Sequence, residues 1–313
     1  MTARFDLITI GRIGVDLYPQ QPGPIAGVTS FAKSIGGTAT NVAVAAARYG
    51  CRVGLITRVG DDPFGRYVRG ALEGFGVDTS FVGIDPALPT PIVFCELDPP
   101  AEPTIIFYRY PKAPDMEVAV DDLDLGAIEA ARIFWVTGTG LSDEPHRGAL
   151  LAALAARGRR HPTVLDIDWR PQFWPDRAPA VDLFARTLAA VTVAIGNRDE
   201  VEVAVGTRDP RAAADRLLAA GVEVAIVKLG ADGVLVATAE GVEVVAPQPV
   251  EVVCGLGAGD AFGGALCYRL LAGDRIGDAV RFANAAGAIV ASRLLCADAM
   301  PTEPEVLALL AES

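Results

Sequence analysis

The amino-acid sequence predicts an α/β protein, a ribokinase-like doubly wound α/β/α sandwich around a mostly parallel sheet, and three observations lead to this class. Short continuous apolar runs recur along the chain, as expected of strands buried on both faces of a sheet. Segments of helical composition separate these runs, which is typical of parallel strands joined by crossover helices. Hydrophobic residues make up 51% of the 313 residues and charged residues 21%, enough apolar material to cover both faces of such a sheet.

The predicted elements follow one another in a βα rhythm. The predicted strands are 7–10, 53–56, 133–136, 164–167, 191–195 and 224–227. The predicted helices between them include 38–49, 63–74, 144–157 and 210–220. A strand pair at 234–237 and 242–246 comes next, and the chain is largely helical from Ala258 onward. We therefore expect one domain over residues 1–313.

Two stretches, about 17–35 and 79–110, depart from this rhythm. The second contains strand-like pieces around 92–97 and 104–110. Together they predict a small β-sheet built from insertions, and at the carboxyl edge of the parallel sheet it would form a lid that excludes water. The alternative is an ordinary antiparallel extension of the large sheet.

Charge and composition exclude several classes of function. With 39 acidic and 27 basic residues, the net charge of -12 offers no basic surface for nucleic acid. The five cysteines show no paired spacing, so we expect small core side chains in a reducing compartment. Neither a secretory signal pattern nor an apolar stretch of membrane-spanning length occurs, which predicts a cytoplasmic protein without a membrane partner.

The strongest local motif is Gly-Leu-Gly-Ala-Gly-Asp-Ala-Phe at 255–262, which leads into an apolar helix. The amides of Gly257, Ala258 and Gly259 would lie at the helix N-terminus, where free N–H groups stabilise negative charge. Asp260 would lie in the first turn, able to accept a proton from an attacking hydroxyl. One short element thus predicts a general base and an anion hole.

Three other interpretations of this motif can be compared with it. An ordinary glycine turn with Asp at a helix start is the simplest. A dinucleotide-binding fingerprint requires glycine where Asp260 stands and a place after the first strand, so a nicotinamide-dependent dehydrogenase is not supported. A phosphate-binding P-loop requires a Gly-Lys pair, and the only lysines are Lys33, Lys112 and Lys228, none of which follows a glycine.

A second glycine motif, Gly-Gly-Thr-Ala-Thr-Asn at 36–41, precedes an alanine-rich helix. Together with Gly-Ala-Gly-Asp at 257–260, it resembles the paired signatures of the ribokinase-like (PfkB) sugar kinases, and the resemblance covers essentially the whole chain. Further matches to the family occur in order at Asp16, 60–65, Asn197 with Glu200, 228–233 and 284–288.

The resemblance implies an ATP-dependent kinase that requires Mg²⁺, and it suggests a homodimer formed through the lids. It implies that the sugar hydroxyls are bound by Asp16, Gly37 and Asn41. It implies that the nucleotide is bound by Asn197, Lys228, Gly230, Gly257, Gly259 and Asn284. It assigns Glu200 to Mg²⁺ through water. From the residues alone, Asn197 and Glu200 could equally be a helix cap and a solvated acid, and Lys228 a surface charge.

Where most relatives have Asp-Thr before the glycine turn, this chain has Cys254-Gly255-Leu256, which argues against activation by a monovalent cation. The variant is similar to that of the 5-dehydro-2-deoxygluconokinases of inositol catabolism, as are Gly11-Arg12, Tyr108-Arg109 and Asp-Ile-Asp-Trp-Arg-Pro at 166–171. Arg109 and Arg170 suit a carboxylate, unless each forms a structural salt bridge.

The predicted reaction is therefore phosphorylation of the terminal hydroxyl of a sugar acid. The favoured substrate is 5-dehydro-2-deoxygluconate. The alternatives are 2-keto-3-deoxygluconate, or another PfkB substrate such as ribose or fructose. A protein of a different class, a catalytically silent sensor of a sugar or nucleotide, would have the same fold.

Overall fold

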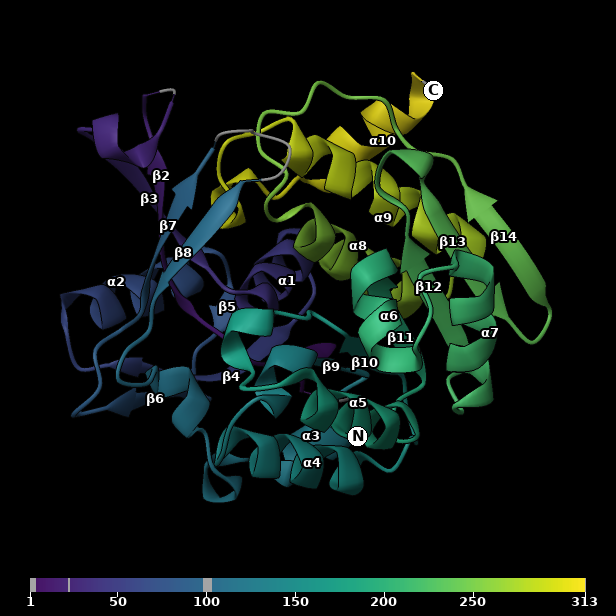
Figure 1. Cartoon of the computed structure of the whole chain (residues 1–313), viewed down its shortest axis with the longest axis horizontal. Helices are drawn as coiled ribbons and strands as arrows, with labels where there is room; N and C mark the ends of the chain where they lie inside the picture. The colour runs from purple at the N-terminus through teal and green to yellow at the C-terminus, as the bar shows by residue number, and fades with distance from the viewer. Residues whose placement is uncertain (1–3, 22, 98–102, 313) are drawn as a thin grey trace.

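A large, mostly parallel sheet runs through the centre of the protein in the computed structural model, which describes residues 4–21, 23–97 and 103–312 (Figure 1). Its strand order is β14-β13-β12-β11-β10-β9-β1-β4-β5, with β6 also paired to β4. The strands are β1 (Leu7–Ile10), β4 (Val53–Gly60), β5 (Val77–Asp78), β6 (Val82–Asp85), β9 (Ile133–Thr137), β10 (Thr163–Asp166), β11 (Val193–Asn197), β12 (Val224–Lys228), β13 (Val234–Thr238) and β14 (Gly241–Val245). Among the described residues, the antiparallel pairings within it are those of β13 with β12 and with β14, so the predicted fold class is confirmed.

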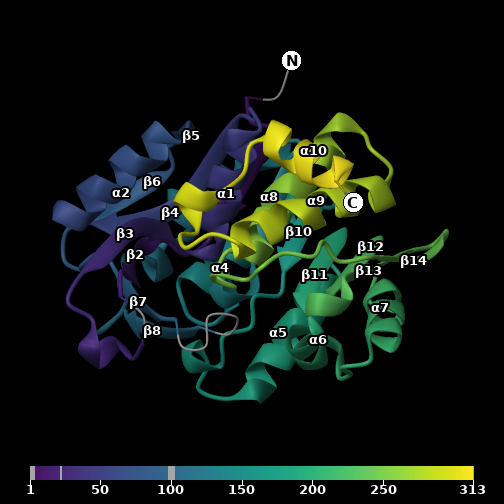
Figure 2. The same ribbon diagram turned by 90° about the horizontal axis from the view of Figure 1, so that it is seen from above.

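Alternate residues of each strand enter two separate apolar cores, one on each face of the sheet. Leu7 and Trp135 lie in one core, whereas Ile8 and Phe134 lie in the other. The first core is covered by α1 (Thr38–Arg48), α2 (Pro63–Gly74), α8 (Ala258–Ala272), α9 (Ile276–Ala291) and α10 (Glu303–Ala311). The second is covered by α3 (Leu125–Ala130), α4 (His146–Arg157), α5 (Arg177–Leu188), α6 (Arg198–Val205) and α7 (Pro210–Ala219). Figure 2 shows the two helical layers on opposite sides of the sheet.

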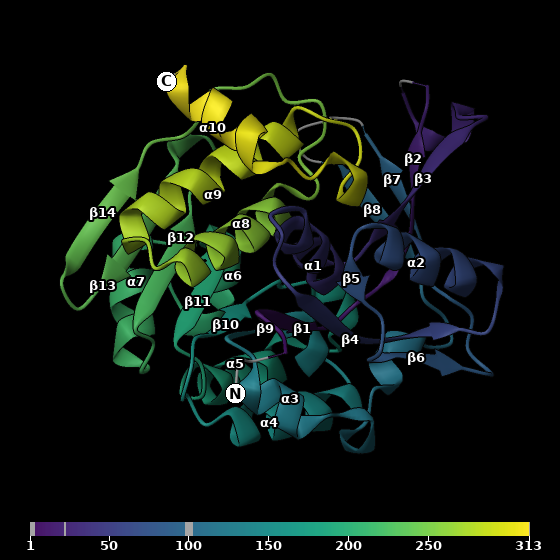
Figure 3. The ribbon, with the colours of Figure 1, turned by 180° about the vertical axis from the view of Figure 1, so that it is seen from behind.

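A second sheet, separate from the first, has the order β3-β2-β7-β8. It consists of β2 (Gly14–Pro19), β3 (Phe31–Gly36), β7 (Ile92–Glu96) and β8 (Thr104–Tyr108). It projects at the end of the molecule that also carries α2 and β6 (Figure 3). The predicted small sheet is therefore present, and it does not extend the large one. Positions 22 and 98–102 of the predicted lid stretches lie outside the described residues.

The second predicted lid stretch, 79–110, divides between the two sheets. Residues 82–85 form β6 and pair in parallel with β4, so this segment belongs to the large sheet. Of the described residues of the stretch, those of β7 and β8 belong to the small sheet. The prediction placed the start of this insertion too early, because β6 is a four-residue strand that is buried only at its two ends.

Helices α1 and α8 approach each other closely at Gly264. A Cβ built there would lie 2.4 Å from the Cβ of Ala45 and 2.8 Å from the backbone nitrogen of Ala46. Both distances are shorter than van der Waals contact, so only glycine allows this helix spacing. The close packing aligns Asn41 on α1 with Asp260 on α8.

We expect Gly264→Ala to lower the free energy of unfolding by about 1–3 kcal/mol, because the added methyl group overpacks this contact. Urea denaturation measures the change. Gly70→Ala in α2 is the matched control, since among the described residues a Cβ built at Gly70 has no neighbour within 4 Å apart from its own helix backbone and adjacent residues. The control is expected to be stabilised by up to about 1 kcal/mol through helix propensity. Equal stability of the two variants would contradict the close-packing argument.

Within the described ranges, no helix combines the length and apolar character needed to cross a membrane. All five cysteines are free thiols. Cys95, Cys254, Cys267 and Cys296 are buried and Cys51 is half-buried, in agreement with the prediction that they are core side chains.

Candidate active site

A cavity of about 270 Å³ lies where the carboxyl ends of the parallel strands meet the small sheet and the N-terminus of α8. Most of the predicted site residues line it, namely Asp16, Gly37, Asn41, Arg109, Arg170, Asn197, Glu200, Lys228, Gly257, Gly259 and Asp260. Ala258, Gly230 and Asn284 are not among the lining residues. Gly230 begins a 3-10 turn after β12, and Asn284 donates a hydrogen bond to the carbonyl of Ala246 at 2.9 Å. Most of the residues that the sequence predicted for the site therefore lie in the cavity wall.

The N-terminus of α8 forms one wall of the cavity. Its N-cap residue, Gly257, has a φ of 80°, a left-handed conformation that favours glycine. A Cβ built at Gly257 would also lie 2.8 Å from the sulfur of Cys296. Because the first N–H groups of a helix have no partner within the helix, this wall can stabilise an anion.

Asp260 lies in the first turn of α8 and accepts a hydrogen bond from Nδ2 of Asn41 at 2.7 Å. Burial raises the pKa of Asp260 to about 6, although the Asn41 hydrogen bond opposes the rise. The Asp168 carboxylate adds to it, whereas Lys228 and Arg170 reduce it. The carboxylate is thus ionised at neutral pH and basic enough to accept a proton.

Lys228 ends β12 and faces this turn, since a Cβ built at Gly259 would lie 3.1 Å from Nζ of Lys228. Burial by itself would lower the pKa of Lys228, but the carboxylates of Asp166 and Glu200 raise it above its ordinary value. Lys228 is therefore a cation of the cavity wall. The alternative of a surface charge at the sheet edge is wrong.

Asn197 and Glu200 form a capping box at the start of α6. Oδ1 of Asn197 accepts from the backbone nitrogens of Asp199 and Glu200, both at 2.9 Å, and Oε2 of Glu200 accepts from the nitrogen of Asn197 at 2.6 Å. Glu200 is buried, not a solvated acid. The pair is therefore a helix cap whose side chains also line the cavity.

The carboxyl groups near Lys228 suit a divalent cation that is held largely by water and phosphate oxygens. No group of three or more His, Cys, Asp or Glu side chains within the described part of the chain is arranged to hold a metal. Mg²⁺ differs from metals that need such a group, because it is usually bound by one or two carboxylates, waters and substrate phosphates. Glu200 and Asp166 supply carboxylates of this kind in the cavity.

Asp16 lies on β2, opposite Ser34 of β3, and its carboxylate covers Gly36. A Cβ built at Gly36 would lie 2.0 Å from Oδ2 of Asp16, so a side chain here would displace the carboxylate. Burial raises the pKa of Asp16 to about 7, although the hydrogen bond donated by the Tyr18 hydroxyl acts to lower it. Gly37 has a φ of 105°, and a Cβ there would lie 2.3 Å from the carbonyl oxygen of Arg12. Both glycines of this motif are therefore required by the local packing.

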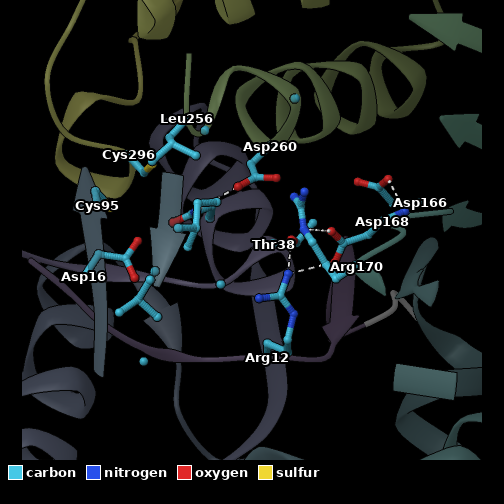
Figure 4. Close-up of a pocket in the computed structure, with 18 of the residues that line it drawn as sticks. Arg12, Asp16, Thr38, Cys95, Asp166, Asp168, Arg170, Leu256, Asp260 and Cys296 are labelled. Atoms are coloured by element: carbon cyan, nitrogen blue, oxygen red, sulfur yellow. Dashed lines mark hydrogen bonds and ion pairs between the residues drawn. The ribbon is translucent and has the colours of Figure 1, made fainter. Parts of the chain in front are cut away.

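The two predicted carboxylate-binding arginines differ in their partners. Arg109 forms a two-pronged ion pair with Asp115, with Nη1 3.1 Å from Oδ2 and Nη2 bonded to Oδ1. Nε of Arg170 lies 3.1 Å from Oδ1 of Asp168. Within the described residues, the two Nη atoms of Arg170 have no hydrogen-bond acceptor, and Figure 4 shows this guanidinium between Asp168 and Asp260. The structural salt bridge considered for each arginine is therefore present in both, but Arg109 uses both Nη atoms in it whereas Arg170 uses Nε.

The sequence matches the model of the pfkB family carbohydrate kinases over residues 4–303. The chain belongs to this family. It is 37% identical to a 5-dehydro-2-deoxygluconokinase of Photobacterium profundum, over 96% of this chain and 93% of the relative. Among solved structures, it is similar to a double-mutant fructokinase of Vibrio cholerae with fructose, ADP and potassium ion bound (TM-score 0.88, 27% identity, 99% and 100% coverage). It is also similar to an aminoimidazole riboside kinase of Salmonella enterica complexed with aminoimidazole riboside and an ATP analogue (TM-score 0.82, 29% identity, 97% and 99% coverage).

Several residues of this carbohydrate kinase's cavity were not predicted as site residues. Arg12, Thr38, Asp166, Asp168, Cys95 and Cys296 line it as well. Arg12 follows the end of β1, Asp166 is the last residue of β10 and Asp168 follows it, and this position at the carboxyl edge is the signal that could have identified them. The cysteines carry no such signal, because their spacing is that of ordinary core residues.

Proposed function

We propose that this carbohydrate kinase transfers the γ-phosphoryl group of ATP to the terminal hydroxyl of a sugar acid, 5-dehydro-2-deoxygluconate first. The observation that carries the proposal is one cavity that holds a basic Asp260 at a helix N-terminus and an Arg170 with free donors. The name of the Photobacterium profundum relative supports the choice of sugar acid.

In the proposed mechanism, Asp260 takes the proton of the attacking hydroxyl as its oxygen forms a bond to the γ-phosphorus. The bond from the γ-phosphorus to the bridging oxygen breaks in line, and ADP leaves. The amides of Gly257, Ala258 and Gly259, with the Lys228 ammonium, stabilise the charge on the transferring group. Asp16, Gly37 and Asn41 orient the sugar through its hydroxyls.

We assign the nucleotide to the side of the cavity formed by Asn197, Lys228 and the start of α8. There Gly230 allows the turn after β12, and Asn284 holds the segment after β14 through Ala246. Glu200 would hold Mg²⁺ through water, and the ion neutralises phosphate charge when bound. Cys254 and Leu256 remain our reason to expect no dependence on potassium.

We also propose that the small sheet closes as a lid over the cavity, and that two copies pair through their small sheets in a cytoplasmic homodimer. Val93, Cys95, Ile105 and Phe107 of this sheet line the cavity, which supports the lid. The edge strand β8 exposes Tyr108, whose relative exposure of 61% is large for a tyrosine and supports the pairing.

An ATP-coupled screen of sugar acids and neutral sugars tests the function, with the position of the phosphate determined by NMR. We expect 5-dehydro-2-deoxygluconate to have the highest kcat/KM, with the phosphate on its terminal carbon. Preference for ribose, fructose or a nucleoside would contradict the sugar-acid proposal. Sugar binding without release of ADP would indicate a sensor.

The pH dependence of kcat/KM is expected to show an acid limb between about pH 6 and 7. Asp260, with a pKa of about 6, must be ionised to act as a base, and Asp16 has a pKa of about 7. The rate should fall at least about tenfold per pH unit below the limb. Asn41→Leu removes a hydrogen bond that lowers the pKa of Asp260, so the limb should move to higher pH. An unmoved limb in this variant would contradict the role of Asp260.

A further inference from the structure

Asp168 is a buried carboxylate that forms ion pairs with two arginines. Nη2 of Arg12 lies 2.9 Å from its Oδ2, and Nε of Arg170 lies 3.1 Å from its Oδ1 (Figure 4). Burial by itself would raise the pKa of Asp168, but the guanidiniums of Arg12 and Arg170 hold it below its ordinary value. The cluster of Arg12, Asp168 and Arg170 therefore joins two guanidiniums to one carboxylate, and Arg170 is also influenced by Asp260, Glu200 and Asp166.

This cluster is held in a fixed geometry. Oγ1 of Thr139 donates to Asp168 at 3.0 Å and accepts from Nε of Arg12 at 3.1 Å. Nη2 of Arg12 also donates to Thr38 at 2.9 Å. The backbone of Asp168 has a φ of 35°, and its nitrogen donates to Oδ1 of Asp166 at 3.2 Å. A non-glycine residue in this conformation costs about 1–3 kcal/mol and is typical of functional sites.

Free hydrogen-bond donors of the cluster belong to residues that line the cavity. Nη1 of Arg12 and both Nη atoms of Arg170 have no acceptor among residues 4–21, 23–97 and 103–312. The side chain of Arg12 is 7% exposed, so its charge is largely removed from solvent. Free planar guanidinium donors match a carboxylate, which accepts charge-assisted hydrogen bonds.

Arg109 lines the same cavity, but its charge is already balanced. Its ion pair with Asp115 uses both carboxylate oxygens, and Asp115 is fully buried and also accepts from the nitrogen of Ile13 at 2.9 Å. Arg109 follows β8 of the small sheet, whereas Ile13 lies between β1 and β2. The Arg109–Asp115 pair therefore fastens the small sheet to the body of the protein.

We propose that Arg12 and Arg170 form the subsite for the substrate's carboxylate, that Asp168 is the positioning residue for both, and that Arg109 has a structural role. This inference rests on the proposed sugar-acid kinase function. It changes the predicted pair of arginines, from Arg109 with Arg170 to Arg12 with Arg170.

Calorimetric binding of gluconate and of sorbitol tests the subsite without turnover, because these ligands differ in a carboxylate against a hydroxymethyl group. Arg12→Gln should weaken gluconate binding about 10- to 100-fold and leave sorbitol binding unchanged. Arg12→Lys should restore part of the gluconate affinity, since it keeps the charge but loses the planar fork. Asp168→Asn, which leaves both arginines in place, should lose the same preference for gluconate.

Arg109→Gln is the matched control. It should lower the Tm and change gluconate and sorbitol binding by the same factor. Loss of gluconate preference in Arg109→Gln but not in Arg12→Gln would overturn the inference. If Arg12→Gln does not fold, the Arg12→Lys and Asp168→Asn variants decide the question through the same ratio of affinities.

Kinetics separate this inference from the proposed function. If the wild type phosphorylates a sugar acid, Arg12→Gln should raise KM for that acid about 10- to 100-fold, with kcat changed by less than about threefold. A fall in kcat at constant KM would overturn the inference. It would mean that the arginines stabilise the transferring phosphoryl group and do not bind the carboxylate of the sugar acid. If the wild type binds gluconate through Arg12 but phosphorylates no sugar acid, the subsite stands and the proposed function is wrong.

Discussion

Asp260→Asn is expected to lower kcat by about 10²- to 10⁴-fold, the usual contribution of a general base. The carboxamide keeps the shape of the side chain and can still accept the hydrogen bond from Asn41, but it cannot take the proton of the attacking hydroxyl. The affinity for ATP should change by less than about threefold. A coupled assay for ADP release and calorimetric titration of ATP measure the two quantities.

The same substitution should stabilise the protein above neutral pH. The raised pKa of Asp260 means that the folded protein binds this proton more tightly than the unfolded chain does, so stability is lost as the pH rises from about 4 to about 6. Asp260→Asn removes that cost, and its Tm at pH 8 should exceed that of the wild type. Low activity with a higher Tm distinguishes loss of the base from misfolding.

Asp182→Asn is the matched control for Asp260→Asn, because Asp182 is exposed on α5, outside the cavity wall. It should leave both kcat and Tm unchanged. An Asp260→Asn variant with activity within a few-fold of the wild type would contradict the role of Asp260 as the base.

The parallel sheet could be predicted because its strands are buried on both faces. In β1 and β9 every residue is buried, and burial of this kind leaves short apolar runs in the sequence. In β6 the two central residues are half-buried and exposed, and this strand was included in the lid instead. Apolar runs thus identify strands inside the sheet better than strands at its edges.

The site could be predicted where a motif is local and not where a contact is distant. Gly257 to Asp260 form one helix start, so their relation follows from the sequence alone. Arg12 and Asp168 are 156 positions apart, and only the arrangement of β1 and β10 on either side of β9, with their carboxyl ends at one edge of the sheet, brings them together. Arg109 and Asp115 are six positions apart, but no period of a regular helix or strand predicts that they pair.

Asn284 and Gly230 illustrate the limit of a family resemblance. Both match family positions, but neither lines the cavity among the described residues. Asn284 lies on α9 and bonds to the carbonyl of Ala246, a contact that positions the chain after β14. Their predicted contact with the nucleotide therefore depends on how ATP extends beyond this cavity.

Arg170→Ala is expected to raise KM for 5-dehydro-2-deoxygluconate by about 10- to 100-fold. The free Nη donors of Arg170 would bind the substrate's carboxylate, and a charge-assisted hydrogen bond contributes about 1.5–3 kcal/mol. KM for ATP should change by less than about twofold. Steady-state kinetics with each substrate varied in turn measure both constants.

The size and direction of this effect depend on what replaces the guanidinium. Arg170→Lys should recover only part of the affinity, because lysine keeps the charge but loses the planar fork. Arg186→Ala, on the exposed surface of α5, is the control and should leave both KM values unchanged. If Arg170→Ala raises KM for ATP as much as for the sugar acid, Arg170 does not discriminate between the two substrates and the carboxylate assignment is wrong. The wild type could instead prefer 2-keto-3-deoxygluconate, with Arg170→Ala raising KM for that acid. The arginine assignment would then stand, because both acids present a carboxylate to the same donors. Only the identity of the preferred sugar acid would change.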